Sequence, residues 1–317
     1  MYSAVLYPPN QQRESTVVGS RKLRVLIYPN REGGTWNGGY AKEIISDGSR
    51  DTVGMSVTVN KSSLGVPAAS TVVFRNLSEE SREIMSLRGL VTEVYMQDPY
   101  NTSFQKLFVG TIVSCLTQRE GADIVTTLHM VSGIVQLTST IIGVGYDKTK
   151  MSQILEKFRS VLGLKRVKTY RDPTDTNIGS RVVDKFYYMG TPYDGLNKLA
   201  FQQAFSWSVD DGELVVVPDS SSTGRVIEIS EKNGLISAVP ILNGPYYIQN
   251  GVKVVSYPIP YLQTCDEVRV LSKINAKTVN RQGMRANLLT FNLSTIDSQW
   301  TMEATCYMFA PILYNEA

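Results

Sequence analysis

The chain has 317 residues, of which 42% are hydrophobic and 19% are charged. That composition supplies a sizeable core and excludes an intrinsically disordered protein, and the length predicts two or three domains. The 32 Lys and Arg residues and 29 acidic residues give a net charge of +3, which provides no general attraction for nucleic acid.

Residues 1–145 are predicted to be mostly strand. In MSVTVN, the side chains of Met55, Val57 and Val59 alternate onto one face, as expected for a half-buried strand. TVVFRNLS is another such segment, and a short helix can follow it with Ser78 as its N-cap. We also expect strands throughout ADIVTTLHMVSGIVQLTSTII. Several short β-branched strands with little helix favour a barrel or a sandwich.

Residues 146–219 follow a different pattern. In DKTKMSQILEKFRSVLG, apolar residues recur at helical spacing, with Asp147 as the candidate N-cap and Gly163 at the end. A second helix is predicted for TPYDGLNKLAFQQAF, where Thr191 would be the N-cap and Pro192 the first helical residue.

A hairpin completes this region in the stretch WSVDDGELVVVPD. The Asp-Gly pair at 211–212 is the two-residue loop favoured in type I′ turns. That register pairs Val209 with Leu214 and Trp207 with Val216, and it places all four side chains on one face. The two helices and this hairpin therefore form a small α+β module.

Strands resume after the linker SSSTG at 220–224. The segments RVIEIS, GVKVVSYPI, NLLTFNLS and WTMEATCYMF have strand composition and predict a second barrel in residues 220–317. The predicted fold is thus mainly β, with two β-barrel domains, 1–145 and 220–317, flanking the α+β module at 146–219.

Reactive side chains are scarce. The single histidine, His129, lies in a strand pattern without a partner, which excludes a metal cluster or serine triad built on several histidines. The three cysteines form no CxxC pair, and we expect them to be small buried side chains. The glycine-rich segment 33–39 lacks the Lys and Ser/Thr of a phosphate loop. We predict no catalytic, metal-binding or cofactor-binding residues, no cofactor and no enzymatic activity.

Neither a signal peptide nor a membrane span is predicted. The opening MYSAVLYPPNQQREST has prolines and polar residues where a signal peptide has an apolar segment. No apolar run reaches the roughly 18 residues needed to cross a bilayer. We therefore expect a soluble product of the cytoplasm.

A basic stretch runs from Lys148 to Arg171, with eight Lys or Arg residues and one acidic residue. A solvated helix face followed by a charged loop explains this stretch. The alternative is a contact surface for an acidic partner subunit or for DNA phosphates. The candidate subunit or partner contacts are Lys165, Arg166, Lys168 and Arg171.

Four stretches, taken in order, resemble the baseplate hub proteins of contractile-tailed bacteriophages, the family of the T4 hub and the Mu-type hub. They are FRNLSEESREIM, the segment from LVTEVYMQ to HMVSG, the hairpin FSWSVDDGELVVVP, and GLISAVPILNGPYYIQNGVKVVSYPIP. Each stretch alone has the composition of many strands and turns. Their order, and the change of domain between them, match the family. The resemblance covers residues 65–275.

This resemblance implies a homotrimer in which two barrel domains per chain form a ring of six. Such a ring adapts a six-fold tail tube to a three-fold central spike and lines a channel for the genome. The implied partners are the tail tube protein, the central spike protein, and other baseplate and tape-measure proteins, with DNA only in transit. The implied location is the virion tail baseplate, after synthesis in the host cytoplasm.

Two other classes of tail protein remain open. A receptor- or carbohydrate-binding protein would use exposed tyrosines, such as those in YMQDPYNT and NGPYYIQN. A peptidoglycan-degrading enzyme would need a pair of carboxylates. Asp210, Asp211 and Glu213 cluster in sequence, but the hairpin turn already explains the first two.

Overall fold

The structure is a computed structural model that describes residues 5–7, 21–28, 42–49, 51–87, 89–97, 103–172, 176–243, 248–274, 276–280 and 282–309. Strands predominate among these residues, so the prediction of a mainly β protein is confirmed. The glycine-rich segment 33–39 lies outside the described ranges.

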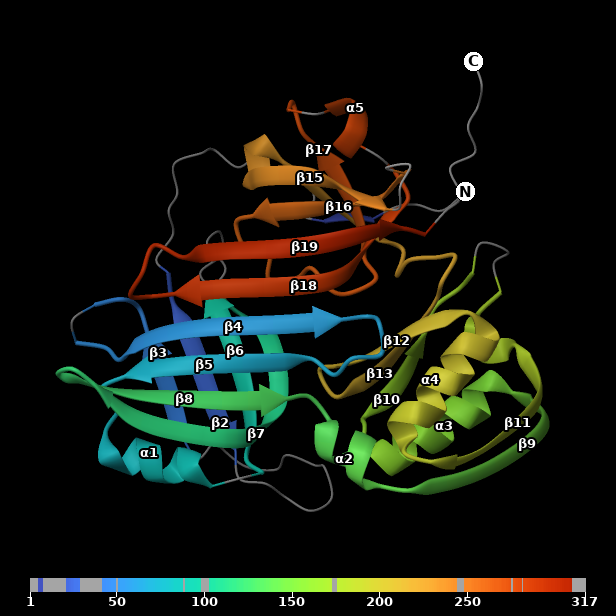
Figure 1. The fold of residues 1–317 in the computed structure, drawn as a ribbon, viewed down its shortest axis with the longest axis horizontal. Coiled ribbons are helices and arrows are strands. Elements are labelled where there is room, and N and C mark those ends of the chain that lie inside the picture. The colour runs from blue at the N-terminus through green and yellow to red at the C-terminus, as the bar shows by residue number, and fades with distance from the viewer. Residues whose placement is uncertain are drawn as a thin grey trace.

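The first half of the structure is an antiparallel sheet with one helix beside it (Figure 1). Its elements are β2 (Leu23–Tyr28), β3 (Lys42–Ser46), β4 (Gly54–Ser62), β5 (Ala69–Arg75), α1 (Glu79–Ser86), β6 (Val91–Gln97), β7 (Phe104–Glu120) and β8 (Asp123–Val131). The strands pair in the order β4-β5-β8-β7-β6-β2-β3. The predicted cap is confirmed, because the Ser78 hydroxyl accepts a hydrogen bond from the Ser81 amide at 3.3 Å.

The second half stands above the first in Figure 1 and contains both antiparallel and parallel pairs. Its elements are β1 (Val5–Tyr7), β14 (Arg225–Ser230), η2 (Glu231–Asn233), β15 (Leu235–Asn243), β16 (Ile248–Ser256), β17 (Glu267–Leu271), α5 (Ala276–Val279), β18 (Met284–Ser294) and β19 (Trp300–Met308). β1 pairs in parallel with β14, so the chain's first described strand lies in the second half.

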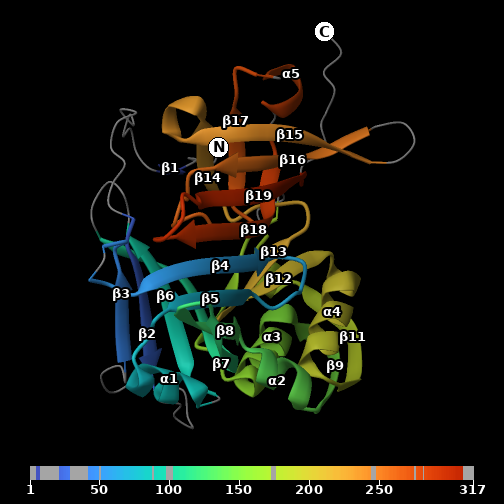
Figure 2. The same ribbon diagram turned by 60° about the vertical axis from the view of Figure 1, so that its left-hand side comes forward.

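The two halves are one continuous sheet. β4 of the first half pairs antiparallel with β18 of the second, from Ser56↔Ser294 to Ser62↔Leu288. We call this pairing the seam. Side chains from both halves form one buried core, in which Val59 and its cross-strand partner Phe291 are fully buried. Figure 2 shows the continuity, with β18 lying directly above β4.

The turn between β18 and β19 strengthens the seam. The Thr295 hydroxyl lies 2.6 Å from the Ser46 hydroxyl and accepts a hydrogen bond from the Met55 amide at 3.1 Å. Gly48 has a φ of 76°, and a Cβ added there would lie 2.8 Å from the Thr295 carbonyl oxygen. Glycine is therefore required where the β3–β4 connection meets this turn.

The module lies beside the sheet and has its own core (Figure 1). It consists of α2 (Ile134–Ser139), β9 (Ile142–Lys150), α3 (Met151–Leu162), β10 (Arg166–Thr169), η1 (Ile178–Ser180), β11 (Val182–Gly190), α4 (Pro192–Gln203), β12 (Phe205–Asp210) and β13 (Glu213–Pro218). β9 pairs with β11, and β13 lies between β10 and β12.

The structure confirms several local predictions for the module. Val209 pairs with Leu214 and Trp207 with Val216, around a turn whose Asp211 has a φ of 51°. The Thr191 hydroxyl caps α4 by accepting from the Asp194 amide at 3.2 Å, and Gly163 ends α3 in the left-handed conformation.

Other local predictions were wrong. Residues 134–139, expected as strand, form α2 and contribute the fully buried Leu137 to the module core. Asp147 lies within β9 and does not cap α3, whose N-cap is Lys150. The division into domains stays a prediction; its boundary at 145/146 lies within β9, which pairs with β11 from Ile142 onward.

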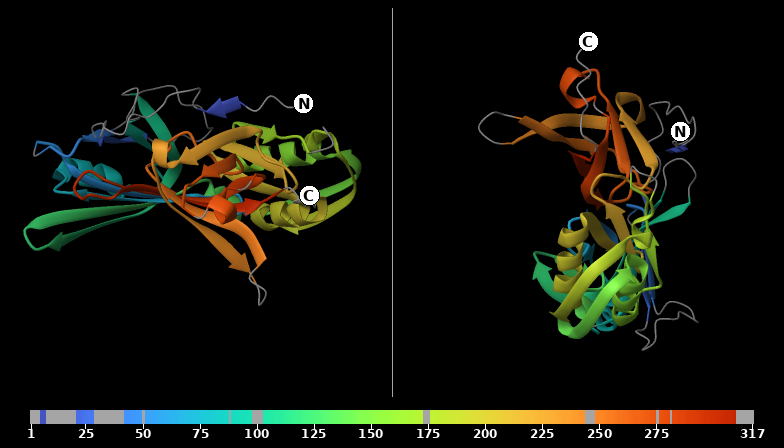
Figure 3. Two further views of the ribbon diagram at one scale, coloured as in Figure 1. Left: turned by 90° about the horizontal axis from the view of Figure 1, so that it is seen from above. Right: turned by 90° about the vertical axis from the view of Figure 1, so that its right-hand side faces the viewer.

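Closed barrels are not seen in either half. Among the strands described, the sheet runs from β3 to β1 with a branch at β18 toward β19, β16 and β15, and its ends do not pair with each other. The β7–β8 and β15–β16 hairpins extend from the body on different sides (Figure 3). The seam, which joins the two halves into one sheet, was not anticipated from the sequence.

Phe291→Ala should destabilise both halves together. Deleting a fully buried Phe ring costs about 3–5 kcal/mol, and this ring lies in the core that the halves share. We expect a lower free energy of unfolding in urea, with a single transition for reporters placed in β6 and in β19. Thr290→Ala, which removes a partly exposed side chain and its single hydrogen bond to Asn60, is the matched control and should cost much less. Separate transitions for the two halves would contradict the shared core.

Candidate functional site at the junction of the three parts

The first half, the module and the second half meet at a set of polar contacts, which we call the junction. It is formed by Lys61, Ser63, Gly65 and Ser132 of the first half, Ser206, Trp207, Ser208 and Asp210 of the module, and Thr264, Arg285 and Asn287 of the second half. Most of these side chains are buried, so each polar group needs a partner. The junction therefore sets the orientation of the three parts seen in this structure.

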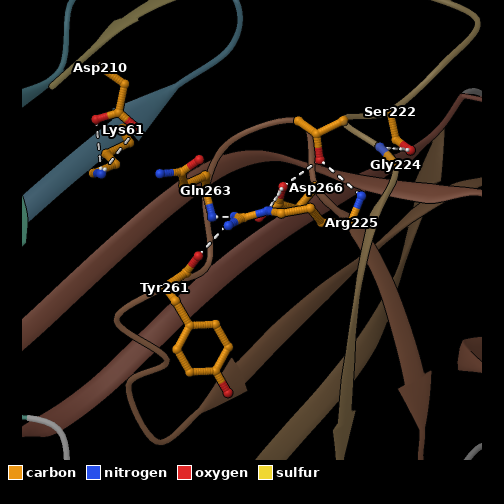
Figure 4. Close-up of polar contacts among 9 residues, drawn as sticks. Lys61, Asp210, Ser222, Gly224, Arg225, Tyr261, Gln263 and Asp266 are labelled. Atoms are coloured by element: carbon orange, nitrogen blue, oxygen red, sulfur yellow. Dashed lines mark hydrogen bonds and ion pairs between the residues drawn. The ribbon is translucent and has the colours of Figure 1, made fainter. Parts of the chain in front are cut away.

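An ion pair joins the first half to the module. Lys61 Nζ lies 3.0 Å from Asp210 Oδ1, and the two side chains are 7% and 13% exposed. Figure 4 shows the ammonium group between both carboxylate oxygens. A buried charge that loses its partner destabilises a protein strongly, so the pair specifies where the hairpin of the module docks.

The neighbouring carboxyl group, Asp211, is not compensated in this way. Its Oδ1 is buried without a hydrogen-bond partner, and its φ of 51° is fixed by the turn. Burial, followed by repulsion from Asp210, raises the pKa of Asp211 above its usual range, and attraction to Lys61 and Lys106 offsets part of that effect. Burial therefore makes the charged form of Asp211 less favourable in the folded protein than in the unfolded chain.

Arg285 joins the second half to the module. Its side chain is 7% exposed, and its guanidinium donates to the Pro218 and Ser221 carbonyl oxygens, each at 3.0 Å, and to the Ser206 hydroxyl at 2.8 Å. The planar guanidinium group holds several acceptors in fixed directions, which an ammonium group cannot do. This residue thus fixes the end of the module hairpin.

The linker at 220–224 is held to the second half by a buried carboxylate. Asp266 is fully buried and accepts hydrogen bonds from the Thr223 hydroxyl at 2.5 Å, the Gln263 amide at 2.8 Å and the Arg225 guanidinium (Figure 4). Arg225 also donates to the Tyr261 carbonyl oxygen at 2.9 Å. The predicted linker is therefore an ordered connection.

Gly65 marks the closest approach of the first half to the module. Its amide donates to the Trp207 carbonyl oxygen at 3.2 Å. It has a φ of 70°, and an added Cβ would lie 2.5 Å from Asn197 Oδ1 and 3.0 Å from the indole nitrogen of Trp207. A side chain at this position would push the module away from the sheet.

A second polar cluster lies on the face of β2, β6 and β7. Glu93 accepts hydrogen bonds from the Tyr28 and Tyr95 hydroxyls at 2.9 and 2.6 Å and from Lys106 Nζ at 2.7 Å. Burial raises the pKa of Glu93, but these donors outweigh it and hold the pKa below its usual range. Burial and the hydrogen bond to Glu93 raise the pKa of Tyr28 to about 12.

The candidate basic contacts are distributed along β10 and beyond it. Arg166 pairs with Glu213 at 2.6 Å, and Lys168 Nζ lies 5.5 Å from the centroid of the Tyr170 ring. Lys165 is exposed beside the hairpin turn, and Arg171 is exposed with its carbonyl oxygen accepting from Ser221. Alternation along a strand sends Arg166 and Lys168 to one face and Lys165 to the other.

The remaining reactive residues have structural partners. His129 is exposed, and its Nδ1 lies 3.3 Å from the Thr71 hydroxyl. The three cysteines are free thiols, with Cys265 and Cys306 buried and Cys115 partly exposed. In the ranges that the structure describes, no group of His, Cys, Asp or Glu is arranged to hold a metal ion, and no helix is long and apolar enough to span a membrane.

Sequence reasoning missed the residues that join the parts. One signal was present: Lys61 continues the inward-facing series of Met55, Val57 and Val59, so alternation places its charge toward the interior. A buried lysine requires a partner, but nothing local identifies Asp210, which lies 149 positions away. Arg285 and Gly65 carried no comparable local signal.

Comparison with solved structures gives the fold. A 43 kDa tail protein of the prophage MuSo2 from Shewanella oneidensis has a TM-score of 0.63 and 10% identity, covering 91% of this chain and 97% of that one. The chain has the fold of a phage tail protein. The sequence-based resemblance is thereby confirmed at the level of the fold.

Other solved structures share this fold. A tail protein of Neisseria meningitidis has a TM-score of 0.61 and 11% identity, covering 90% of this chain and 96% of that one. An Escherichia coli component of the type VI secretion system, described as similar to the T4 tail proteins gp27 and gp5, has a TM-score of 0.58 and 14% identity over 83% of this chain and 76% of that one. No family model and no curated protein matches the sequence.

Asp211→Asn should raise stability at neutral pH. The folded pKa of Asp211 is raised, so the wild-type protein loses stability as pH rises from the unfolded pKa of about 3.9 through the folded pKa. Asn removes this loss and tolerates the left-handed φ. We expect a higher urea midpoint for the variant at neutral pH, and a smaller difference below about pH 4.

The matched control for this prediction is Asp210→Asn, which removes the partner of Lys61 and should lower the midpoint at neutral pH. Equal effects of the two substitutions, or a gain for Asp211→Asn that does not vary with pH, would contradict the assignment of an uncompensated charge to Asp211.

Proposed function

We propose that the protein is a structural hub of a phage tail baseplate that connects the tail tube to the central spike. The observation that carries this proposal is the match of nearly the whole chain to a prophage tail protein, with 91% and 97% of the two chains covered. The described residues supply a continuous sheet, a docked module and ordered connections between them, which suits a role that depends on shape and contact. No bond-making step is part of the proposed role.

In this proposal the chain acts as a trimer. Each chain contributes two sheet units joined at the seam, so three chains present six units to a six-fold tube and three equivalent surfaces to a spike. The two halves act as barrel-like units whose remaining edges close against neighbouring chains. Such closure would cover sheet edges that a lone chain leaves unpaired. The tape-measure protein and other baseplate proteins would be further partners, and the site of action is the virion.

The polar face of β2, β6 and β7 suits the wall of a channel for DNA. Two of its cations are neutralised, because Lys106 pairs with Glu93 at 2.7 Å and Arg24 with Glu43 at 2.6 Å. A wall of free lysines would retain phosphates through counterion release and would slow the passage of DNA. A charge-balanced face avoids this retention.

Native mass spectrometry of the protein mixed with the tube and spike proteins of the same phage tests this function. We expect complexes with three copies of this chain that include the spike. The separate chain is the reference, since partners can be needed to assemble the ring. Binding of the protein to host cells without any complex with tube or spike would instead favour a receptor-binding tail protein. Hydrolysis of purified cell wall would favour a tail enzyme.

A charge reversal tests the proposed contact surface. We expect the triple variant Lys165→Glu, Arg166→Glu and Lys168→Glu to impair formation of the complex without changing the far-ultraviolet circular dichroism of the isolated chain. These side chains are exposed or partly exposed, and exposed charges contribute little to folding. Lys157→Glu, at an exposed lysine of α3, is the control. An unchanged yield of complexes would show that the basic stretch is not part of the interface.

A further inference from the structure

The module and the sheet are separately packed bodies. Leu155, Phe158 and Leu196 are fully buried in the core of the module, whereas the two halves of the sheet share a different core. Interiors packed at crystal-like density move as units, so each of these bodies resists internal deformation. Relative movement of the two bodies is therefore concentrated at the junction between them.

Several contacts that cross the junction are polar. Besides the Lys61–Asp210 pair, the hydroxyl oxygens of Ser208 and Thr264 lie 3.5 Å apart, and the Gly65 amide binds the Trp207 carbonyl oxygen. Interfaces within a chain that are polar and do not share an apolar core resemble transient interfaces and permit domain movement. Asp211, whose Oδ1 is buried without a hydrogen-bond partner, follows Asp210 directly in the hairpin turn.

Each of the two chain crossings between sheet and module contains a glycine in the left-handed region. Gly133 has a φ of 65° and precedes α2, and Gly224 has a φ of 80° and precedes β14. A Cβ added at Gly224 would meet nothing within 4 Å, so packing does not demand glycine there. Residues that absorb large backbone changes at hinges are often small, and glycine has the widest range.

The junction is asymmetric. Near the linker, Arg285 holds the Pro218 and Ser221 carbonyl oxygens of the connection and the Ser206 hydroxyl of β12. Near Gly65, the module is held by one backbone hydrogen bond of 3.2 Å, by the pair formed by Lys61, and by a 3.5 Å hydrogen bond from the Ser132 hydroxyl to the Val209 carbonyl oxygen. One rigid guanidinium group thus makes three hydrogen bonds at the Arg285 end, whereas separate residues make the contacts at the Gly65 end.

We propose that the module turns as a rigid body on the sheet, with its pivot at Arg285 and its opening at Gly65. The seam and both cores stay intact during this movement, while the hairpin tip leaves Lys61. This conformational device goes beyond the proposed hub role and does not depend on it, because the movement belongs to the single chain.

Two amides of the purified full chain report on this movement. Gly65 and Ser63 are both buried, but the Gly65 amide binds Trp207 across the junction, whereas the Ser63 amide binds the Asn287 carbonyl oxygen at 2.9 Å between the two halves of the sheet. We expect residue-resolved hydrogen exchange at Gly65 to be at least about tenfold faster than at Ser63, since local openings require less free energy than global unfolding. Equal exchange at the two positions would overturn the proposal.

A disulfide across the junction should abolish that difference. Ser208→Cys with Thr264→Cys joins module to sheet, and peptide mapping distinguishes this bond from one to the adjacent Cys265. Once oxidised, the variant should exchange at Gly65 as slowly as at Ser63, and reduction should restore fast exchange. The control pair, Thr117→Cys with Thr126→Cys, replaces hydroxyls 3.2 Å apart within the β7–β8 hairpin and should change neither amide. Fast exchange at Gly65 that persists in the locked variant would refute the movement.

Gly65→Ala tests whether the two bodies are independent. Its Cβ would collide with Asn197 of the module, so we expect the junction to open permanently. Amides of β12 that face the junction should then exchange faster, while amides of α3 and β18 keep their wild-type protection. Loss of protection in α3 or β18 would mean that module and sheet unfold as one unit, which would contradict rigid-body movement.

Discussion

The antiparallel pairing of β4 with β18 is the constraint on which the rest of the structure depends. It joins segments more than 220 positions apart, from Ser56↔Ser294 to Ser62↔Leu288, and it merges the buried residues of both halves into one core. A pairing shifted by one residue would turn Phe291 from the core toward solvent, so the register is strongly specified. The turn at Thr295 then reinforces this register with bonds to Ser46 and Met55.

Apolar packing and polar contacts have different roles in this molecule. Burial of apolar surface holds the two halves together without any need for charges. The module instead docks through the Lys61–Asp210 pair and the contacts of Arg285, which require defined partners. Buried ion pairs add little net stability compared with apolar packing, but removing one partner costs about 3–5 kcal/mol. The junction therefore determines orientation more than it determines stability.

Features that depend on residues close together in the sequence could be predicted, and features that depend on distant residues could not. The cap at Ser78, the cap at Thr191 and the hairpin at 211–212 depend on neighbours a few residues away, and each was predictable. Residues 134–139 were predicted as strand, because a short apolar run fits the period of a strand as well as that of a helix. In the structure they form a helix, which places Leu137 in the core of the module.

Contacts between distant segments left almost no trace in the sequence. The seam joins two strands in which apolar and polar residues alternate as in many strands. Nothing in the sequence of either strand identifies the other as its partner. The contacts of the junction could not be predicted for the same reason. Lys61 is an exception in part, because its inward-facing position indicated that it needs a partner but did not identify which one. The resemblance to tail hubs pointed to the fold of a phage tail protein, and a solved tail protein that shares this fold over 91% of the chain agrees with it.

The proposed role as a hub requires the two sheet units to keep a fixed orientation relative to each other, and the seam provides this. Cysteine cross-linking across the seam tests this most directly. Thr58 and Asn292 are cross-strand partners whose side chains share a 3.3 Å hydrogen bond, so Thr58→Cys with Asn292→Cys should form a disulfide in the folded chain. The pair Thr58→Cys with Phe291→Cys is offset by one residue, points to opposite faces and should not form one. Equal cross-linking of both pairs, or of neither, would contradict the continuous sheet.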